Sequence, residues 1–154
     1  MEQKVLLVDD DPVTRAFCAD ILAGHFRLAT ASSATEALRR LRQDGPFAVV
    51  VSALYLPTPD GRSFPATVRL LCPNTALIVL AADPSPETVM NALNNDNVFG
   101  FFNKSEPMTT IIRKIRAALD MHRRQAAMGS PSDRNVLSME ERSFLRKLAI
   151  SWPC

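Results

Sequence analysis

The feature that most constrains the fold is a regular alternation of short apolar runs with amphipathic segments. Five runs rich in Val, Ile, Leu and Phe are too short to be helices of their own and predict strands. The runs are Val5–Val8, Phe26–Ala31, Phe47–Ala53, Ala76–Ala81 and Val98–Phe102. Strand and helix patterns that repeat in this order predict an α/β domain with a five-stranded, doubly wound parallel sheet and helices on both faces.

Capping residues mark the clearest helix starts. Asp11 followed by Pro12 predicts an N-cap with proline at the first helical position. Ser33 with Glu36 three residues later has the pattern of a capping box. The first of these helices has four apolar residues that we expect to share its buried face: Val13, Phe17, Ile21 and Leu22.

The chain changes character near residue 125. Residues 126–137 contain the run Gly129-Ser130-Pro131-Ser132, which is typical of a linker. Ser138 with Glu141 then predicts the start of a short helix. We therefore expect one domain over residues 1–125, a linker over 126–137, and over 138–154 a short helical tail or the start of an output domain missing from this chain.

Composition excludes some classes of protein and leaves others open. The chain is 47% hydrophobic and 22% charged, which is typical of a soluble globular protein. No apolar run approaches the length of a membrane span and no signal peptide is visible, so we predict a cytoplasmic protein. The sparse, odd set of cysteines is typical of thiols in a reducing compartment: Cys18, Cys72 and Cys154.

Charge is unevenly distributed along the sequence. Residues 1–106 carry 9 Lys/Arg and 12 Asp/Glu, whereas residues 107–154 carry 9 and 4. The basic C-terminal third leaves nucleic-acid binding open as an alternative. The absence of interleaved aromatic residues or a base-reading motif in this sequence disfavours that alternative, and a solvated helix face explains the charge more simply.

Charged residues follow two of the predicted strands, and alanines end two others. Asp9 and Asp10 come directly after the first strand, and Lys104 follows the fifth. The third and fourth strands end at Ala53 and Ala81. Parallel sheets bind ligands beyond the carboxyl ends of their strands, so this edge is the place to expect a functional site.

Over about residues 3–122 the chain resembles the receiver domains of two-component response regulators. Three stretches carry the resemblance: Val8-Asp9-Asp10-Asp11, Ala53-Leu54-Tyr55-Leu56-Pro57 with Asp60-Gly61, and Phe101-Phe102-Asn103-Lys104. The resemblance implies a flavodoxin-like sheet with strand order 2-1-3-4-5. It also implies a role in phosphorelay signal transduction without enzymatic activity of its own, with a histidine kinase, a regulator or an output domain as the protein partner.

The resemblance assigns a role to each residue at the edge. Acids that match Asp9 and Asp10 hold a divalent metal in the family. The position of Ala53 is that of the aspartate that accepts the phosphoryl group, and the position of Ala81 is that of a hydroxyl residue that bonds it. Lys104 matches a lysine that contacts the phosphoryl oxygen, and Phe101 matches an aromatic that reports phosphorylation by changing rotamer.

The residue after the family's lysine is usually a proline joined by a cis bond. Here it is Ser105. A cis bond before a residue other than proline costs about 3 kcal/mol. We therefore expect a trans bond between Lys104 and Ser105 and a locally altered loop.

Two alanines at this edge decide the predicted function. Alanine at position 53 has no nucleophile, and alanine at 81 has no donor for a phosphoryl oxygen. We therefore predict a degenerate, non-phosphorylatable receiver. No cofactor is expected beyond a weak Mg²⁺ site at Asp9 and Asp10, because a third oxygen ligand is missing. Lys104 is expected to act as the counter-ion of these acids.

Simpler interpretations stay open beside this one. Asp9 and Asp10 could cap the first helix, Lys104 could be an ordinary solvated lysine, and Phe101 could serve in packing alone. Another open alternative is a receiver that is phosphorylated or ligand-controlled through a non-standard site.

Without phosphotransfer, such a receiver would act through protein contacts. The resemblance suggests that the fourth helix, fifth strand and fifth helix form a homodimer interface. The residues expected to contribute are Val89, Met90, Leu93, Phe99, Arg113 and Arg116.

Overall fold

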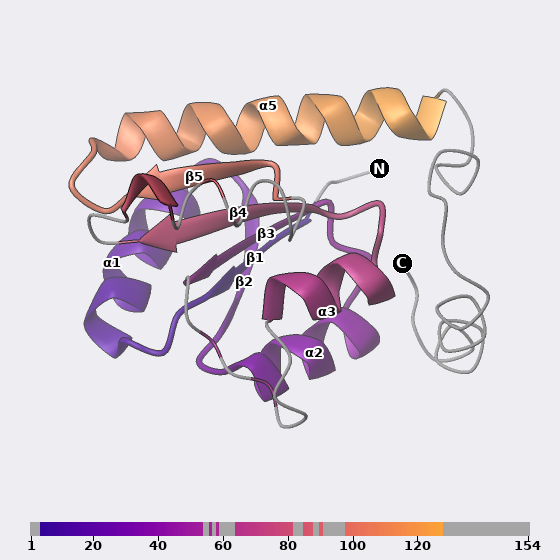
Figure 1. Ribbon diagram of the computed structural model, residues 1–154, viewed down its shortest axis with the longest axis horizontal. Coiled ribbons are helices and arrows are strands. Elements are labelled where there is room, and N and C mark those ends of the chain that lie inside the picture. The colour runs from indigo at the N-terminus through magenta and orange to yellow at the C-terminus, as the bar shows by residue number, and fades with distance from the viewer. Residues whose placement is uncertain are drawn as a thin grey trace.

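The computed structural model describes residues 4–53, 56, 58, 64–81, 85–87, 90 and 98–127. The strands are β1 (Lys4–Val8), β2 (Arg27–Ala31), β3 (Val49–Ala53), β4 (Ala76–Ala81) and β5 (Gly100–Asn103). The described helices are α1 (Pro12–Leu22), α2 (Ala34–Gln43), α3 (Phe64–Leu71) and α5 (Met108–Ala127). All strands pair in parallel in the order β2-β1-β3-β4-β5 (Figure 1), which confirms the predicted sheet.

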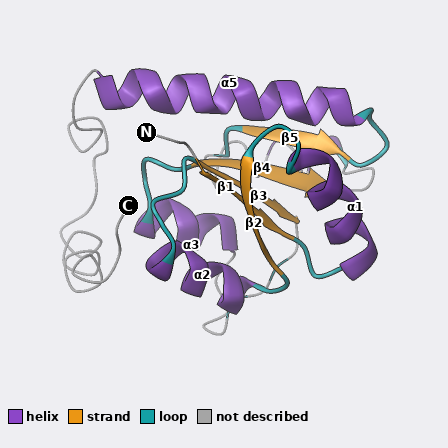
Figure 2. Cartoon of the chain, turned by 180° about the vertical axis from the view of Figure 1, so that it is seen from behind, coloured by secondary structure: helices purple, strands orange, loops and turns teal. Residues whose placement is uncertain are grey.

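The sheet is covered on both faces. Figure 2 shows α5 along one face and α2 and α3 along the other. One apolar layer joins the sheet to α2 and α3, and a second joins it to α1 and α5. The central strands β3 and β4 are buried along their whole length. This double burial explains why their sequences are continuous apolar runs without alternation.

Both predicted N-caps are present. The Asp11 carboxylate accepts a hydrogen bond from the Val13 amide at 3.2 Å, and Pro12 occupies the first turn of α1. The Ser33 hydroxyl accepts from the Glu36 amide at 3.1 Å. The Glu36 carboxylate reaches back to the amide and hydroxyl of Ser32, and these hydrogen bonds lower the pKa of Glu36. Local polar groups therefore fix where α1 and α2 begin.

The predicted buried face of α1 is wrong for two of its four residues. Val13 and Phe17 are 76% and 60% exposed, whereas Leu22 is buried and Ile21 packs against the core. The buried side of the helix is set by Cys18 and Leu22. Val13 and Phe17, four residues apart, lie together on the neighbouring side of the helix, which faces solvent.

The cysteine prediction is confirmed only in part. Cys18 is a buried free thiol, and burial raises its pKa. Cys72 is disulfide-bonded, so its interpretation as a thiol is wrong. Spacing along a chain does not reveal which sulfur atoms lie close in space, because the pairing depends on the fold.

Several predictions fall outside the part of the chain that the structure describes. The predicted interface residues Val89 and Leu93 and the turn sequence Asp60-Gly61 lie there. So does the segment 128–154, which contains most of the predicted linker and all of the predicted tail. The helix α5 runs through Ala127, two residues into the range assigned to the linker. Among the described helices, none combines the length and apolar character that crossing a bilayer requires.

Candidate functional site

Four strand ends meet at the carboxyl edge of the sheet. In the register, Val8 of β1 lies beside Ser52 of β3, and Ala53 lies beside Leu80 of β4. Ala81 of β4 lies beside Asn103 of β5, and the Lys104 amide donates to the Ala81 carbonyl at 2.8 Å. Residues that are far apart in sequence therefore converge here, as the alternation of strands and helices predicted.

Asp9 is the buried charge of the site, with only 1% of its side chain exposed. Its Oδ1 accepts from the Asp11 amide at 2.9 Å. Its Oδ2 lies 3.4 Å from the Lys104 ammonium nitrogen and has no hydrogen-bond partner among the described groups. The Asp9 main-chain carbonyl accepts from the Arg15 guanidinium at 2.8 Å. Lys104 is therefore the closest described charge that compensates the buried carboxylate, as predicted.

The loop after β5 holds Lys104 in position. The Asn103 side-chain oxygen accepts from the Ser105 amide and hydroxyl at 3.0 and 2.9 Å. The Glu106 carboxylate in turn accepts from the Asn103 amide at 3.0 Å. The only cis bond among the described residues joins Gly45 to Pro46, so the bond before Ser105 is trans, as predicted.

The two acids that follow Asp9 in the sequence, Asp10 and Asp11, are both exposed. Asp11 is the N-cap of α1 and also accepts from the Thr14 hydroxyl at 2.6 Å. The bonds from Thr14 and the Val13 amide hold the pKa of Asp11 below its usual value. The N-cap predicted at Asp11 is therefore confirmed. The side chain of Asp9, for which a capping role was left open, is engaged with Lys104 and the Asp11 amide.

The donor set fits a divalent metal poorly. Within the described residues, no group of three or more His, Cys, Asp or Glu side chains is placed to hold an ion. The oxygen Oδ2 of Asp9 faces an ammonium group instead. Mg²⁺ requires oxygen ligands in near-octahedral geometry, and position 53 supplies a methyl group. The described residues at this edge therefore do not form a complete magnesium site.

The central part of the edge is apolar. Ala53 and Ala81 are both buried, at 7% and 5% exposure. The neighbouring Ser52 is fully buried, and its hydroxyl donates to the Ala53 carbonyl at 2.9 Å. The hydroxyl nearest to position 53 along the chain is thus engaged with the backbone.

Phe101 is half-buried and packs against the core on the side of α2 and α3. Its main-chain carbonyl accepts a hydrogen bond from the Lys114 ammonium group of α5. This arrangement agrees with the packing interpretation of Phe101. A change of rotamer linked to a signal stays a prediction.

The residues predicted to form an interface are partly accessible. Met90 is 55% exposed, Arg113 and Arg116 are exposed, and Phe99 is half-buried. The Arg116 guanidinium lies 3.3 Å from Nδ1 of His25, which follows α1. Sequence reasoning missed a second apolar surface, the pair Val13 and Phe17 on α1, because it assigned both residues to the core. Their exposure depends on how α1 is rotated about its axis.

Comparison with known families gives one clear match. The family described as response regulator receiver domain matches residues 5–116. No curated protein sequence matches the chain.

Solved structures of similar proteins agree with the observed topology. An adenylate cyclase from Rhodopirellula baltica is 28% identical with a TM-score of 0.74, and the match covers 83% of this chain and 95% of that one. The signal receiver domain of an HD domain-containing protein from Pseudomonas fluorescens Pf-5 is 27% identical with a TM-score of 0.72, covering 80% and 98%. NtrX from Brucella abortus, solved with ADP, is 20% identical with a TM-score of 0.74, and the match covers 96% of this chain but 34% of that one.

Proposed function

This chain belongs to the response regulator receiver family, and from that premise we propose that it is a receiver that cannot accept a phosphoryl group at the usual position and that signals through protein contacts. One observation carries the proposal. The strand end at which the family places its acceptor carboxylate holds the buried methyl group of Ala53. An acyl phosphate requires a carboxylate, so alanine cannot form one.

The surroundings of Ala53 support the same conclusion. Ala81, at the end of the adjacent strand, offers no hydroxyl to a phosphoryl oxygen. The Lys104 ammonium group is engaged with Asp9 at 3.4 Å. The Ser52 hydroxyl is buried and bonded to a carbonyl, which disfavours it as a substitute acceptor. A phosphoryl group placed here would find one cation and no partner hydroxyl at Ala81.

Intact mass spectrometry tests this part of the proposal. The chain is incubated with acetyl phosphate and Mg²⁺, and its mass is compared with that of an untreated sample. We expect no phosphoryl adduct. An adduct on the folded chain would support the alternative of a non-standard acceptor, and peptide mapping would identify the residue that carries it.

Without an acceptor at position 53, the proposed receiver would pass on a signal through contacts with other proteins. The described surface carries large exposed apolar side chains at Met90, Val13 and Phe17, and apolar residues of this size favour association when buried together. The predicted homodimer would use Met90, Phe99 and the basic residues Arg113 and Arg116. A histidine kinase, a regulator or an output domain are the other proposed partners.

The proposal also includes the location of the chain in the cell and the role of its C-terminal residues. We place the chain in the cytoplasm and assign residues 138–154 to a tail or to the start of an output domain. The matched structures named as an adenylate cyclase and as an HD domain-containing protein make an enzymatic output domain a reasonable candidate for the second option.

Light scattering over a range of protein concentrations tests the proposed homodimer. A dimer whose proportion is unchanged by acetyl phosphate and Mg²⁺ is the expected result. Arg116→Glu should weaken it several-fold through charge reversal, while Arg39→Glu on α2 serves as the control. A monomer at every concentration would eliminate the homodimer and leave a different protein as the partner.

A further inference from the structure

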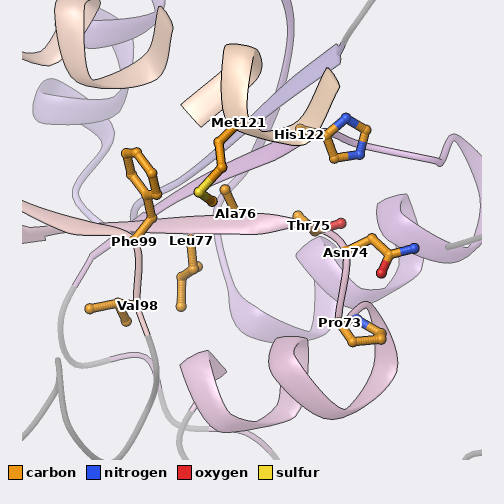
Figure 3. Close-up of a pocket in the computed structure, with 9 residues that line it drawn as sticks. All are labelled: Pro73, Asn74, Thr75, Ala76, Leu77, Val98, Phe99, Met121 and His122. Carbon is orange, nitrogen blue, oxygen red and sulfur yellow. The ribbon is translucent and has the colours of Figure 1, made fainter. Parts of the chain in front are cut away.

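A pocket of about 360 Å³ lies at the opposite end of the sheet from Ala53 and Lys104. It is bounded by Asn74 in the loop before β4, by Leu77 of β4, by Val98 and Phe99 ahead of β5, and by Met121 and His122 of α5 (Figure 3). Its volume falls within the range of roughly 300–1,000 Å³ that is usual for ligand sites in proteins.

The lining combines an apolar surface with a buried nitrogen that lacks a hydrogen-bond partner within the described part of the chain, and a single occupant would contact both. Phe99 and Met121 offer an aromatic ring and a thioether, and Met121 is 37% exposed. Nδ1 of His122 is buried and has no hydrogen-bond partner among the described residues. Burial also lowers the pKa of His122, so the ring is neutral at pH 7 and one of its nitrogens can accept a hydrogen bond. A buried polar atom without a partner destabilises the folded state, so an occupant that donates a hydrogen bond to this nitrogen is favoured.

The chain's own C-terminal part starts close to this pocket. The helix α5 ends at Ala127, five residues after His122 and therefore about one and a half turns beyond it. Residues 128–137 can span at most roughly 35 Å, which is enough to return residues from Ser138 onward to the pocket. This later part of the sequence contains four large apolar residues: Phe144, Leu145, Leu148 and Trp152.

We propose that the pocket holds the C-terminal segment of the same chain, residues 138–154, with the indole of Trp152 as the side chain that fills it. Indole has one hydrogen-bond donor and no acceptor, which suits Nδ1 of His122. Its ring would pack against Phe99 and the thioether of Met121, both favourable contacts for an aromatic ring. This docking goes beyond the proposed function, since it concerns the end of the sheet remote from Ala53.

Fluorescence of the full chain tests the proposal, because Trp152 is the only tryptophan. Samples contain a thiol reductant, so that no covalent link through Cys72 contributes. We expect blue-shifted emission and slow quenching by acrylamide. Met121→Glu puts a charge in the pocket and should shift the emission to the red and raise the quenching constant several-fold. Thr109→Glu, which adds the same charge to an exposed position near the start of α5, should behave like the wild type.

Circular dichroism checks that each variant folds, and Leu148→Glu repeats the test from the side of the segment if Met121→Glu does not fold. Wild-type emission typical of a fully exposed indole would overturn the proposal. Blue-shifted emission that survives both Glu variants would overturn it too. A blue shift lost on dilution would assign the pocket to a second copy's segment, and a small molecule released by denaturing the wild type but not Met121→Glu would assign it to a ligand.

Discussion

The four strands whose ends meet at the site form two pairs with different chemistry. The outer two of these four, β1 and β5, are followed by a buried acid and its counter-ion, Asp9 and Lys104, with 3.4 Å between the charged atoms, and β2 lies beyond β1. The inner pair, β3 and β4, ends in the buried methyl groups of Ala53 and Ala81. The charge pair thus lies beside two strand ends that carry only methyl groups. We propose that Asp9 and Lys104 stabilise this edge of the sheet.

The largest expected effect on stability comes from placing a charged side chain at the end of β3, one of the inner pair of strands. Ala53→Asp would place a carboxylate at a position with 7% exposure, on the strand next to the one that Asp9 follows. We expect it to lower the free energy of unfolding by about 3 kcal/mol in the absence of divalent ions, because a buried charge is poorly solvated. Mg²⁺ should restore part of this loss by binding the folded state. Urea denaturation with and without Mg²⁺ measures both effects.

Ala53→Asn is the matched control, since its side chain has nearly the same shape without the charge. It should lose less stability than Ala53→Asp and should not respond to Mg²⁺. If Ala53→Asp were as stable as the wild type without Mg²⁺, the inner strand ends would not be the apolar environment described above.

A smaller effect is expected from breaking the charge pair of the outer strands. Lys104→Met removes the counter-ion of a carboxylate that is 1% exposed, while Lys104 itself is 32% exposed. We expect a loss of about 2 kcal/mol, below the range for a fully buried pair because solvent screens the lysine. Urea denaturation again supplies the measurement, with Arg39→Met on α2 as a control for the loss of a surface cation.

A double-mutant cycle with Asp9→Asn separates the pair from its surroundings. The loss caused by Lys104→Met should shrink when Asp9 is already neutral. Equal losses in both backgrounds would show that Lys104 stabilises the edge through some other contact.

The smallest effect is expected at Asp11, where the acid is exposed. Asp11→Ala removes the N-cap of α1 and should lower the urea midpoint by less than Lys104→Met does. The bonds that lower the pKa of Asp11 favour its ionised form in the folded state. Their contribution is therefore present above the ordinary pKa of 3.8 and is lost as the pH falls through the lower folded value.

Urea midpoints measured from neutral pH down to acid would follow this loss. Asp11→Asn keeps a capping side chain without the charge, so the wild type should approach it in stability at the acid end. A constant difference between the two across the whole range would contradict the assigned cause.

The sequence predicted the sheet well because burial on both faces leaves an unmistakable pattern. The runs at Val49–Ala53 and Ala76–Ala81 are apolar throughout, and the structure places both in the centre. The ends of these strands follow from the same pattern, so the positions of Ala53 and Ala81 at one edge were predictable. The pairing of Asp9 with Lys104 followed from the resemblance to receivers, which places both residues at that edge.

Other features depend on side-chain geometry that no pattern encodes. The four apolar residues of α1 have helical spacing, but the rotation of the helix leaves Val13 and Phe17 in solvent. The bond from Arg15 to the Asp9 carbonyl depends on the rotamer of a long side chain. The pocket beside His122 is built from separate stretches of chain, so it appears only once the fold is known.

The most direct test of the account is an amide NMR spectrum of the wild-type chain recorded before and after addition of Mg²⁺ with beryllium fluoride, a mimic of the phosphoryl group. Ala53→Asp, if folded, serves as the responsive control. The account predicts that the signals of Ala53, Ala81, Phe101 and Lys104 stay where they are in the wild type. Specific, saturable shifts of these four signals would show that the edge binds a phosphoryl group without the carboxylate, and would contradict the account.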